Sequence, residues 1–173
     1  MLTINFYPDS DFWDLGEAVE KYRSWWKKDA SKIIKSIEGV SGLKFRETYI
    51  NAVVFRARFS SQSFPLSLRA DVDDTLKVAI LIHELCHRLV VGNGVKLLKL
   101  GIKTEEGRIL ERHKVVDLIL YDIWVDLYGK KFADKAVLAE ANSQKTNVYK
   151  KAWKWALSMS MGERQKLFAV CKK

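Results

Sequence analysis

The segment HELCH, residues 83 to 87, places two histidines and a glutamate inside the otherwise apolar run LKVAILIHELCHRLVVGNG. If this run is a helix, His83 and His87 lie one turn apart on the same face, so both imidazoles can reach a single ion. That spacing suits zinc, which histidine nitrogens bind at ~2.0–2.1 Å. Glu84 lies roughly 100° further around the helix, where it can take a proton from a water molecule on the metal. The segment therefore predicts a zinc site that carries its own general base.

Two histidines leave such a site incomplete, because a catalytic zinc usually has three protein ligands and one open position. The following segment EEGRILERHKVVDLILYDIWVDLYG contains His113, the third and last histidine of the chain. We expect His113 to be the third ligand and Asp117, one turn later, to hold the second ring nitrogen of a ligand histidine. Asp117 itself, Glu106 and Glu111 are alternatives for the third ligand.

Three further residues near these segments have more than one interpretation. Tyr121 continues roughly the face of His113 and Asp117, and its hydroxyl is a candidate for stabilising an oxyanion, as is that of Tyr128. Packing in an aromatic core is an equal alternative for both tyrosines. Cys86 projects away from the line of the two histidines, so we expect it to pack in the core and not to bind metal.

HExxH on one helix, with a third ligand and an aspartate four residues later on the next helix, resembles the zincin metallopeptidases. The pattern is most similar to the gluzincin and minigluzincin type, whose third ligand is the glutamate of an ExxxD pattern; here HKVVD has His113 in its place. The resemblance covers about residues 45–128. It implies zinc-dependent hydrolysis of peptide bonds with Glu84 as the base, and a peptide or protein substrate lying extended along the edge strand Pro65–Arg69. A three-histidine set is also similar to the SprT-like proteases, although their third histidine usually follows sooner.

The chain before HELCH has the pattern of a small sheet and a long helix. β-Branched and aromatic residues indicate strands at residues 2–7 and 43–59, and the proline of Pro65–Arg69 is typical of an edge strand. Apolar residues at helical spacing predict a helix from Phe12 to Ile37. The residues of this helix that should face the core are Leu15, Val19, Tyr22, Trp26, Ile33 and Ile37.

Capping residues and glycines predict where the helices begin and end. The HELCH helix should end near Val91 before GNG, and the next helix should close at Tyr128 before Gly129. The remainder of the chain should form two or three helices. The expected N-terminal caps are Asp9, Ser10 or Asp11, then Asp73 or Asp74, then Thr104, and finally Ser160 with Glu163 as a capping box.

The order of these elements, strands with two helices and then helices only, indicates an α+β fold. Together with the resemblance it predicts one zincin-like domain over residues 1–173. Residues 1–103 would hold a small mixed or antiparallel sheet, a backing helix and the active-site helix. Residues 104–173 would hold the third-ligand helix and extra C-terminal helices.

The net charge of +9 lies mostly in the last quarter of the chain, since residues 129–173 carry eleven Lys and Arg against three acidic residues. Nucleic acid or an acidic protein is therefore a possible partner, and a solvated basic face is the alternative. Trp153 and Trp155, among several lysines, either stack on bases or anchor a helix to the core. The alternative function is accordingly an inactive or latent zincin-fold binding module with a basic helical surface.

The remaining composition bears on the compartment. The opening residues do not have the pattern of a secretory signal, and no apolar run approaches the ~20 residues that a membrane span needs, so we expect no membrane partner. Cys86 in a predicted helix and Cys171 at the C-terminus predict no disulfide bond. These features favour the cytoplasm.

Overall fold

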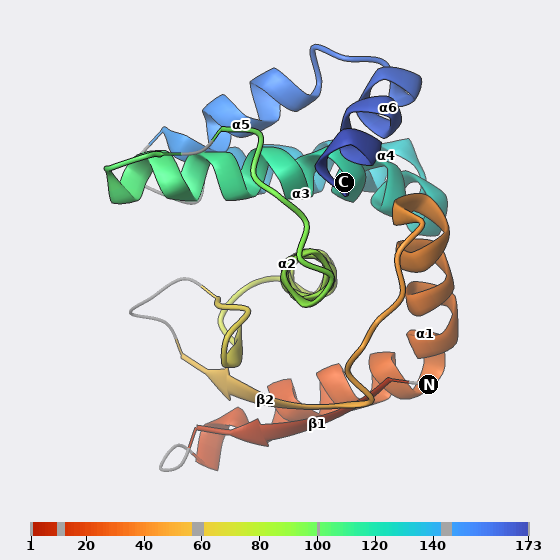
Figure 1. Cartoon of the computed structure of the whole chain (residues 1–173). Helices are drawn as coiled ribbons and strands as arrows, with labels where there is room; N and C mark the ends of the chain where they lie inside the picture. The colour runs from red at the N-terminus through yellow and green to blue at the C-terminus, as the bar shows by residue number, and fades with distance from the viewer. Residues whose placement is uncertain (1, 10–12, 57–60, 100, 143–146, 173) are drawn as a thin grey trace. The chain divides into compact units, whose positions relative to one another are not determined.

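The computed structural model describes residues 2–9, 13–56, 61–99, 101–142 and 147–172. It is an α+β structure whose chain divides into two compact units (Figure 1). The first unit comprises residues 1–38 and 43–93, and the second comprises residues 39–42 and 94–173. The expectation that the whole chain is one domain stays a prediction.

The first unit contains a three-stranded sheet in the order β1-β2-β3. β1 (Thr3–Pro8) pairs with β2 (Tyr49–Phe55), and β2 pairs with β3 (Leu66–Arg69), both in parallel. β3 is an edge strand, as its proline-led sequence predicts. On each strand alternate residues are buried, as a sheet with one covered face requires.

The parallel pairing differs from the mixed or antiparallel sheet that we expected. For β1 and β2 the cause is the connection: the two strands are joined through a long helix, and such a crossover returns the chain to run in the same direction. In the described parts of the chain, an antiparallel pairing occurs at the isolated bridge between Gln62 and Ser67, on the outer side of β3.

The long helix is α1 (Gly16–Ser41), which follows a short 3-10 turn at Trp13–Leu15. The six apolar residues predicted to face the core are all buried. The ring of Tyr22 stacks on Phe6 of β1 at 5.6 Å between centroids, which fixes α1 against the sheet. α1 runs four residues beyond the predicted end. Of its expected caps, Ser10 and Asp11 lie outside the described residues.

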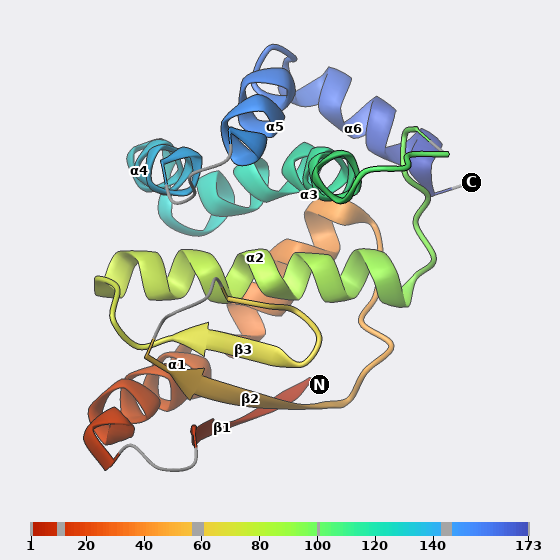
Figure 2. The ribbon, with the colours of Figure 1, turned by 90° about the vertical axis from the view of Figure 1, so that its left-hand side faces the viewer.

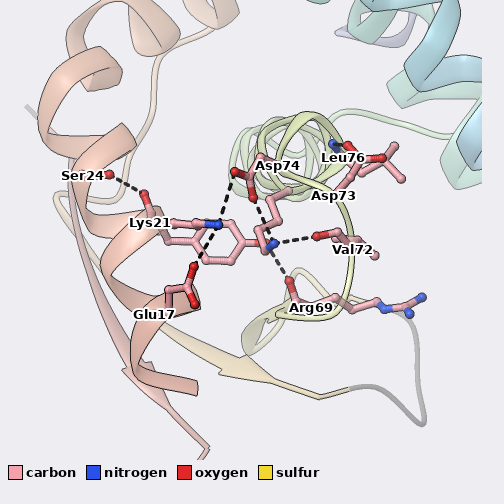
Figure 3. Close-up of polar contacts among 10 residues, drawn as sticks. Glu17, Lys21, Ser24, Arg69, Val72, Asp73, Asp74 and Leu76 are labelled. Atoms are coloured by element: carbon pink, nitrogen blue, oxygen red, sulfur yellow. Dashed lines mark hydrogen bonds and ion pairs between the residues drawn. The ribbon is translucent and has the colours of Figure 1, made fainter. Parts of the chain in front are cut away.

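The HELCH segment lies in α2 (Asp74–Gly92), which runs alongside β3 (Figure 2). Asp73 caps this helix, because its side chain accepts a hydrogen bond from the backbone N–H of Leu76 at 3.0 Å. Lys21 of α1 lies 3.4 Å from the Asp74 carboxylate and 3.2 Å from Glu17, so a cation links α1 to the start of α2 (Figure 3). The start of α2 is thus the one predicted from the sequence.

The second unit is helical: α3 (Glu105–Tyr128), α4 (Lys130–Ala141), α5 (Val148–Ala156) and α6 (Met161–Cys171). α3 contacts the other three helices. Thr104 caps α3 through the N–H of Gly107, and Gly129 ends it with a φ of 82°, as predicted. The capping box of Ser160 and Glu163 at the start of α6 is also confirmed.

Two buried contacts hold α3 in this unit. The Trp124 ring stacks on Trp153 of α5 with 5.5 Å between centroids, and Trp153 donates a hydrogen bond to Glu140 of α4 at 3.1 Å. The guanidinium of Arg164 in α6 pairs with the Asp122 carboxylate, and both side chains are 6% exposed. No helix in the described part of the chain is long and apolar enough to cross a membrane.

The Asp73 cap gives a direct test of how α2 begins. Replacing Asp73 by Ala removes the acceptor for the Leu76 N–H and should lower the free energy of unfolding by about 1 kcal/mol. Asp73→Asn retains an acceptor oxygen and should stay close to the wild-type value. Urea unfolding measures both; an alanine variant as stable as the asparagine variant would contradict the capping role.

Candidate metal centre

His83 and His87 face each other on the first unit's helix α2. Their Nε2 atoms are 2.9 Å apart, with 4.8 Å between the ring centroids. His83 is 4% exposed. Two imidazole nitrogens at this distance either share a proton or face a common cation. Two ligands held at ~2.0–2.1 Å by a tetrahedral ion stand about 3.3 Å apart, so a small rotation of the rings opens room for a metal.

Glu84 is buried on the same helix, at 8% exposure. One of its carboxylate oxygens, Oε2, accepts a hydrogen bond from the Ser63 hydroxyl at 2.6 Å. This distance is typical of a hydrogen bond to a charged acceptor. Ser63 was missed by the sequence analysis, because 20 intervening residues separate the two and nothing in the local pattern links them.

Arg88, one residue after His87, was also missed. Its guanidinium pairs with the Glu47 carboxylate, with Nε 3.0 Å from Oε2, and donates to the backbone carbonyl of Ser63. The same guanidinium lies over the Phe64 ring, 4.4 Å from its centroid. Arg88 therefore ties the segment that carries Ser63 to helix α2.

The outer side of β3 is occupied by the chain's own residues. The N–H and carbonyl of Ser67 bond to Gln62 at 2.8 and 3.0 Å, and the N–H of Arg69 bonds to the Ser61 hydroxyl at 3.3 Å. The Arg69 carbonyl accepts from Tyr22, whose hydroxyl keeps its proton because burial raises its pKa. Ser67 and Arg69 thus already have partners within the chain on this side of β3, and docking of an extended peptide along Pro65–Arg69 stays a prediction.

His113 is buried on α3 of the second unit, at 7% exposure. Its Nδ1 lies 2.8 Å from the carbonyl oxygen of Ile109. A carbonyl can only accept, so Nδ1 carries the proton and Nε2 presents its lone pair, as a metal ligand must. The ring also packs edge-on against Tyr149 of α5, with 4.3 Å between centroids. Both contacts fix the orientation of the imidazole.

His83, His87 and His113 form a set that could hold a metal ion. Each offers one ring nitrogen, and these ligand atoms all lie within 4.8 Å of one another. In the described part of the chain, this set contains neither Asp117 nor a glutamate. Three neutral imidazoles are a donor set that zinc and several other divalent transition metals accept.

The alternatives for the third ligand lie elsewhere on α3. Glu106 is exposed and 3.7 Å from Lys151 of α5, and Glu111 is buried with its carboxylate 2.7 Å from Lys114. Asp117 is 1% exposed, one turn after His113. A carboxylate buried to this extent needs a compensating partner. That the partner of Asp117 is the second ring nitrogen of a ligand histidine stays a prediction.

Tyr121, the candidate oxyanion stabiliser, donates its hydroxyl to Asp134 of α4 at 2.8 Å. Burial and the Asp134 carboxylate raise the pKa of this hydroxyl, so it remains a proton donor at neutral pH. Its role toward a substrate stays a prediction.

Cys86 and Trp153 have the positions of core residues. Cys86 is fully buried on α2 and forms no disulfide bond with Cys171. Trp153 is 2% exposed, so its face cannot stack on a base. Trp155 is half-buried beside Lys114, whose Nζ lies 5.3 Å from the ring centroid.

In comparisons with protein-family models, curated proteins and solved structures, nothing matched this chain. The resemblance to zincins therefore depends on the residues of the HExxH and HKVVD segments alone.

Zinc stoichiometry of single variants tests the ligand set. His83→Ala and His87→Ala should bind less than a tenth of the wild-type zinc at matched free zinc, and His113→Ala should weaken binding about 100-fold or more. Glu106→Ala should bind zinc as the wild type does, because its carboxylate faces Lys151. Equilibrium dialysis with metal analysis measures these affinities. Full binding by His113→Ala, or loss of binding in Glu106→Ala, would contradict the set.

Proposed function

We propose that this chain is a zinc-dependent peptidase in which Glu84 is the general base. The observation that carries the proposal is the three-histidine set, two members of which flank the buried Glu84 on one helix. If His83 and His87 only stabilised the fold, they would not need a third imidazole nearby. The buried Glu84 carboxylate beside them would then only add to the free-energy cost of burying polar groups. All four groups have a use in metal-assisted hydrolysis.

Zinc is the metal that this donor set favours. Three histidine ligands leave one coordination position open for water and substrate, which is the arrangement of catalytic zinc sites. Magnesium and calcium prefer carboxylate and carbonyl oxygens, and the set has none. The protonated Nδ1 of His113 directs its Nε2 to the metal, so one ligand at least is oriented by the backbone of its own helix.

A bound zinc would supply a polarised substrate carbonyl and a water molecule whose pKa is lowered toward ~7. Glu84 would accept a proton from this water as its oxygen forms a bond to the carbonyl carbon. The same carboxyl group would then donate the proton to the amide nitrogen as the carbon–nitrogen bond breaks, which leaves a carboxylate and an amine. Tyr121, whose hydroxyl keeps its proton, is the candidate donor to the oxyanion, and it would exchange its hydrogen bond to Asp134 for one to the substrate.

The second candidate is an inactive or latent module that binds nucleic acid or an acidic protein. The exposed lysines of α5 favour it, namely Lys150, Lys151 and Lys154. The buried face of Trp153 argues against base stacking as part of such binding. This alternative predicts association that weakens steeply with salt, and no hydrolysis.

Replacing Glu84 by Gln separates metal binding from catalysis. Glutamine retains the size of the side chain but cannot take a proton, so peptide cleavage should fall by about 100-fold or more while bound zinc stays near the wild-type amount. Casein or a quenched-fluorescent peptide library, with and without a chelator, reports cleavage. Glu20→Gln, at an exposed glutamate of α1, is the matched control and should cleave normally. Cleavage by Glu84→Gln at the wild-type rate would refute the mechanism.

A further inference from the structure

A short segment of the first unit, Ser61 to Phe64, contacts both the edge of the sheet and helix α2. We call this segment the bracket. On one side, Gln62 exchanges two backbone hydrogen bonds with Ser67 of β3. On the other side, the Ser63 hydroxyl donates to Glu84 at 2.6 Å and the Ser63 carbonyl accepts from Arg88. The bracket thus connects the sheet to the carboxylate of the proposed base.

We infer that Ser63 is a positioning residue for Glu84, and that Arg88 and Glu47 hold Ser63 in place. This inference rests on the proposed function of Glu84 as the base. A glutamate side chain has three rotatable bonds, and a hydroxyl held at one oxygen selects a single orientation of the carboxylate. The other oxygen, Oε1, then has a defined direction in which to take a proton.

The bracket is itself well anchored, as a positioning device must be. Arg88 forms a two-point pair with the Glu47 carboxylate, and its side chain is only 11% exposed. A bidentate guanidinium pair fixes direction as well as charge, which a lysine cannot do. The guanidinium also lies over the Phe64 ring, so it holds the bracket through both the backbone and a side chain.

The position of Arg88 on α2 makes the contact specific to this part of the helix. It follows His87 directly and lies one turn after Glu84, so the proposed base and its anchor lie on the same face of the helix. The bracket therefore restrains the part of α2 that carries both the histidines and the base. Misplacement of a catalytic group by about 1 Å can cost 100-fold in rate, which is the scale of effect that such a constraint can prevent.

Cleavage kinetics of zinc-loaded variants test the role of the Ser63 hydroxyl. Ser63→Ala should lower kcat by about 10- to 100-fold with KM and zinc content unchanged, and Ser63→Thr, which restores a hydroxyl, should recover most of the loss. Ser24→Ala removes a hydroxyl that donates to the Lys21 carbonyl within α1 and is the matched control, with wild-type kinetics. A Ser63→Ala enzyme with wild-type or higher kcat, or a threonine variant as slow as the alanine variant, would overturn the inference.

Amide hydrogen exchange in metal-free protein tests the same contact without any activity. Glu84→Ala, Ser63→Ala and Arg88→Lys should each raise the exchange rates of the Gln62 and Ser67 amides by about tenfold, because each loosens the bracket. Ser24→Ala should leave both amides unchanged. Unchanged exchange in Glu84→Ala would show that the bracket and the carboxylate are not coupled, which overturns the inference even if the enzyme is active. An inactive wild type that binds no zinc would instead refute the proposed function, while exchange still decides whether the bracket holds Glu84.

Discussion

The physical constraint on which the first unit depends is the burial of His83 and Glu84 in the middle of α2, beside the half-buried His87. His83 and Glu84 are almost fully buried, and the residues around them in the helix are apolar. Burying an ionisable group without a partner costs several kcal/mol, so the surroundings of α2 must supply partners. The histidines supply one another with a partner at 2.9 Å, and Ser63 supplies one for Glu84. A cation between the imidazoles would satisfy both rings at once.

Other contacts within the first unit hold α2 in position near both of its ends. Asp73 and the cation of Lys21 define where the helix begins, and hence where each later residue points. Arg88 near the other end holds the bracket against the helix. In the second unit, α3 is held by the stacking of buried Trp124 on Trp153 and by the ion pair of Asp122 with Arg164. The backbone carbonyl of Ile109 orients the His113 ring on this helix.

A feature of the fold or of the site could be predicted from the sequence when the residues that cause it are close together in the chain. The starts of α2, α3 and α6 were predicted because Asp73, Thr104 and Ser160 each accept a hydrogen bond from an N–H group three residues away. The HExxH pair was found because helical spacing alone places its histidines together. The direction of the strands was not predicted, because it depends on how the chain returns between them, through α1 in the case of β1 and β2, and not on the strands themselves.

The missed features of the site have a common cause. Ser63 and Arg88 act on residues that are distant in sequence, and a serine or an arginine near an edge strand has no distinctive local pattern. The occupied outer side of β3 was likewise not predictable, since it requires residues 61 and 62 to fold back beside Ser67 and Arg69. Single-sequence reasoning identified the three neighbouring histidines better than the contacts that hold the surrounding residues in position.

X-ray absorption at the zinc edge of the zinc-loaded protein tests the central claim most directly, because it counts the donor atoms around the ion. Our account predicts three imidazole nitrogens at ~2.0–2.1 Å and one light oxygen donor, with no sulfur at ~2.3 Å. Fewer than three imidazoles, a sulfur donor from Cys86 or Cys171, or a shell of carboxylate oxygens would contradict it.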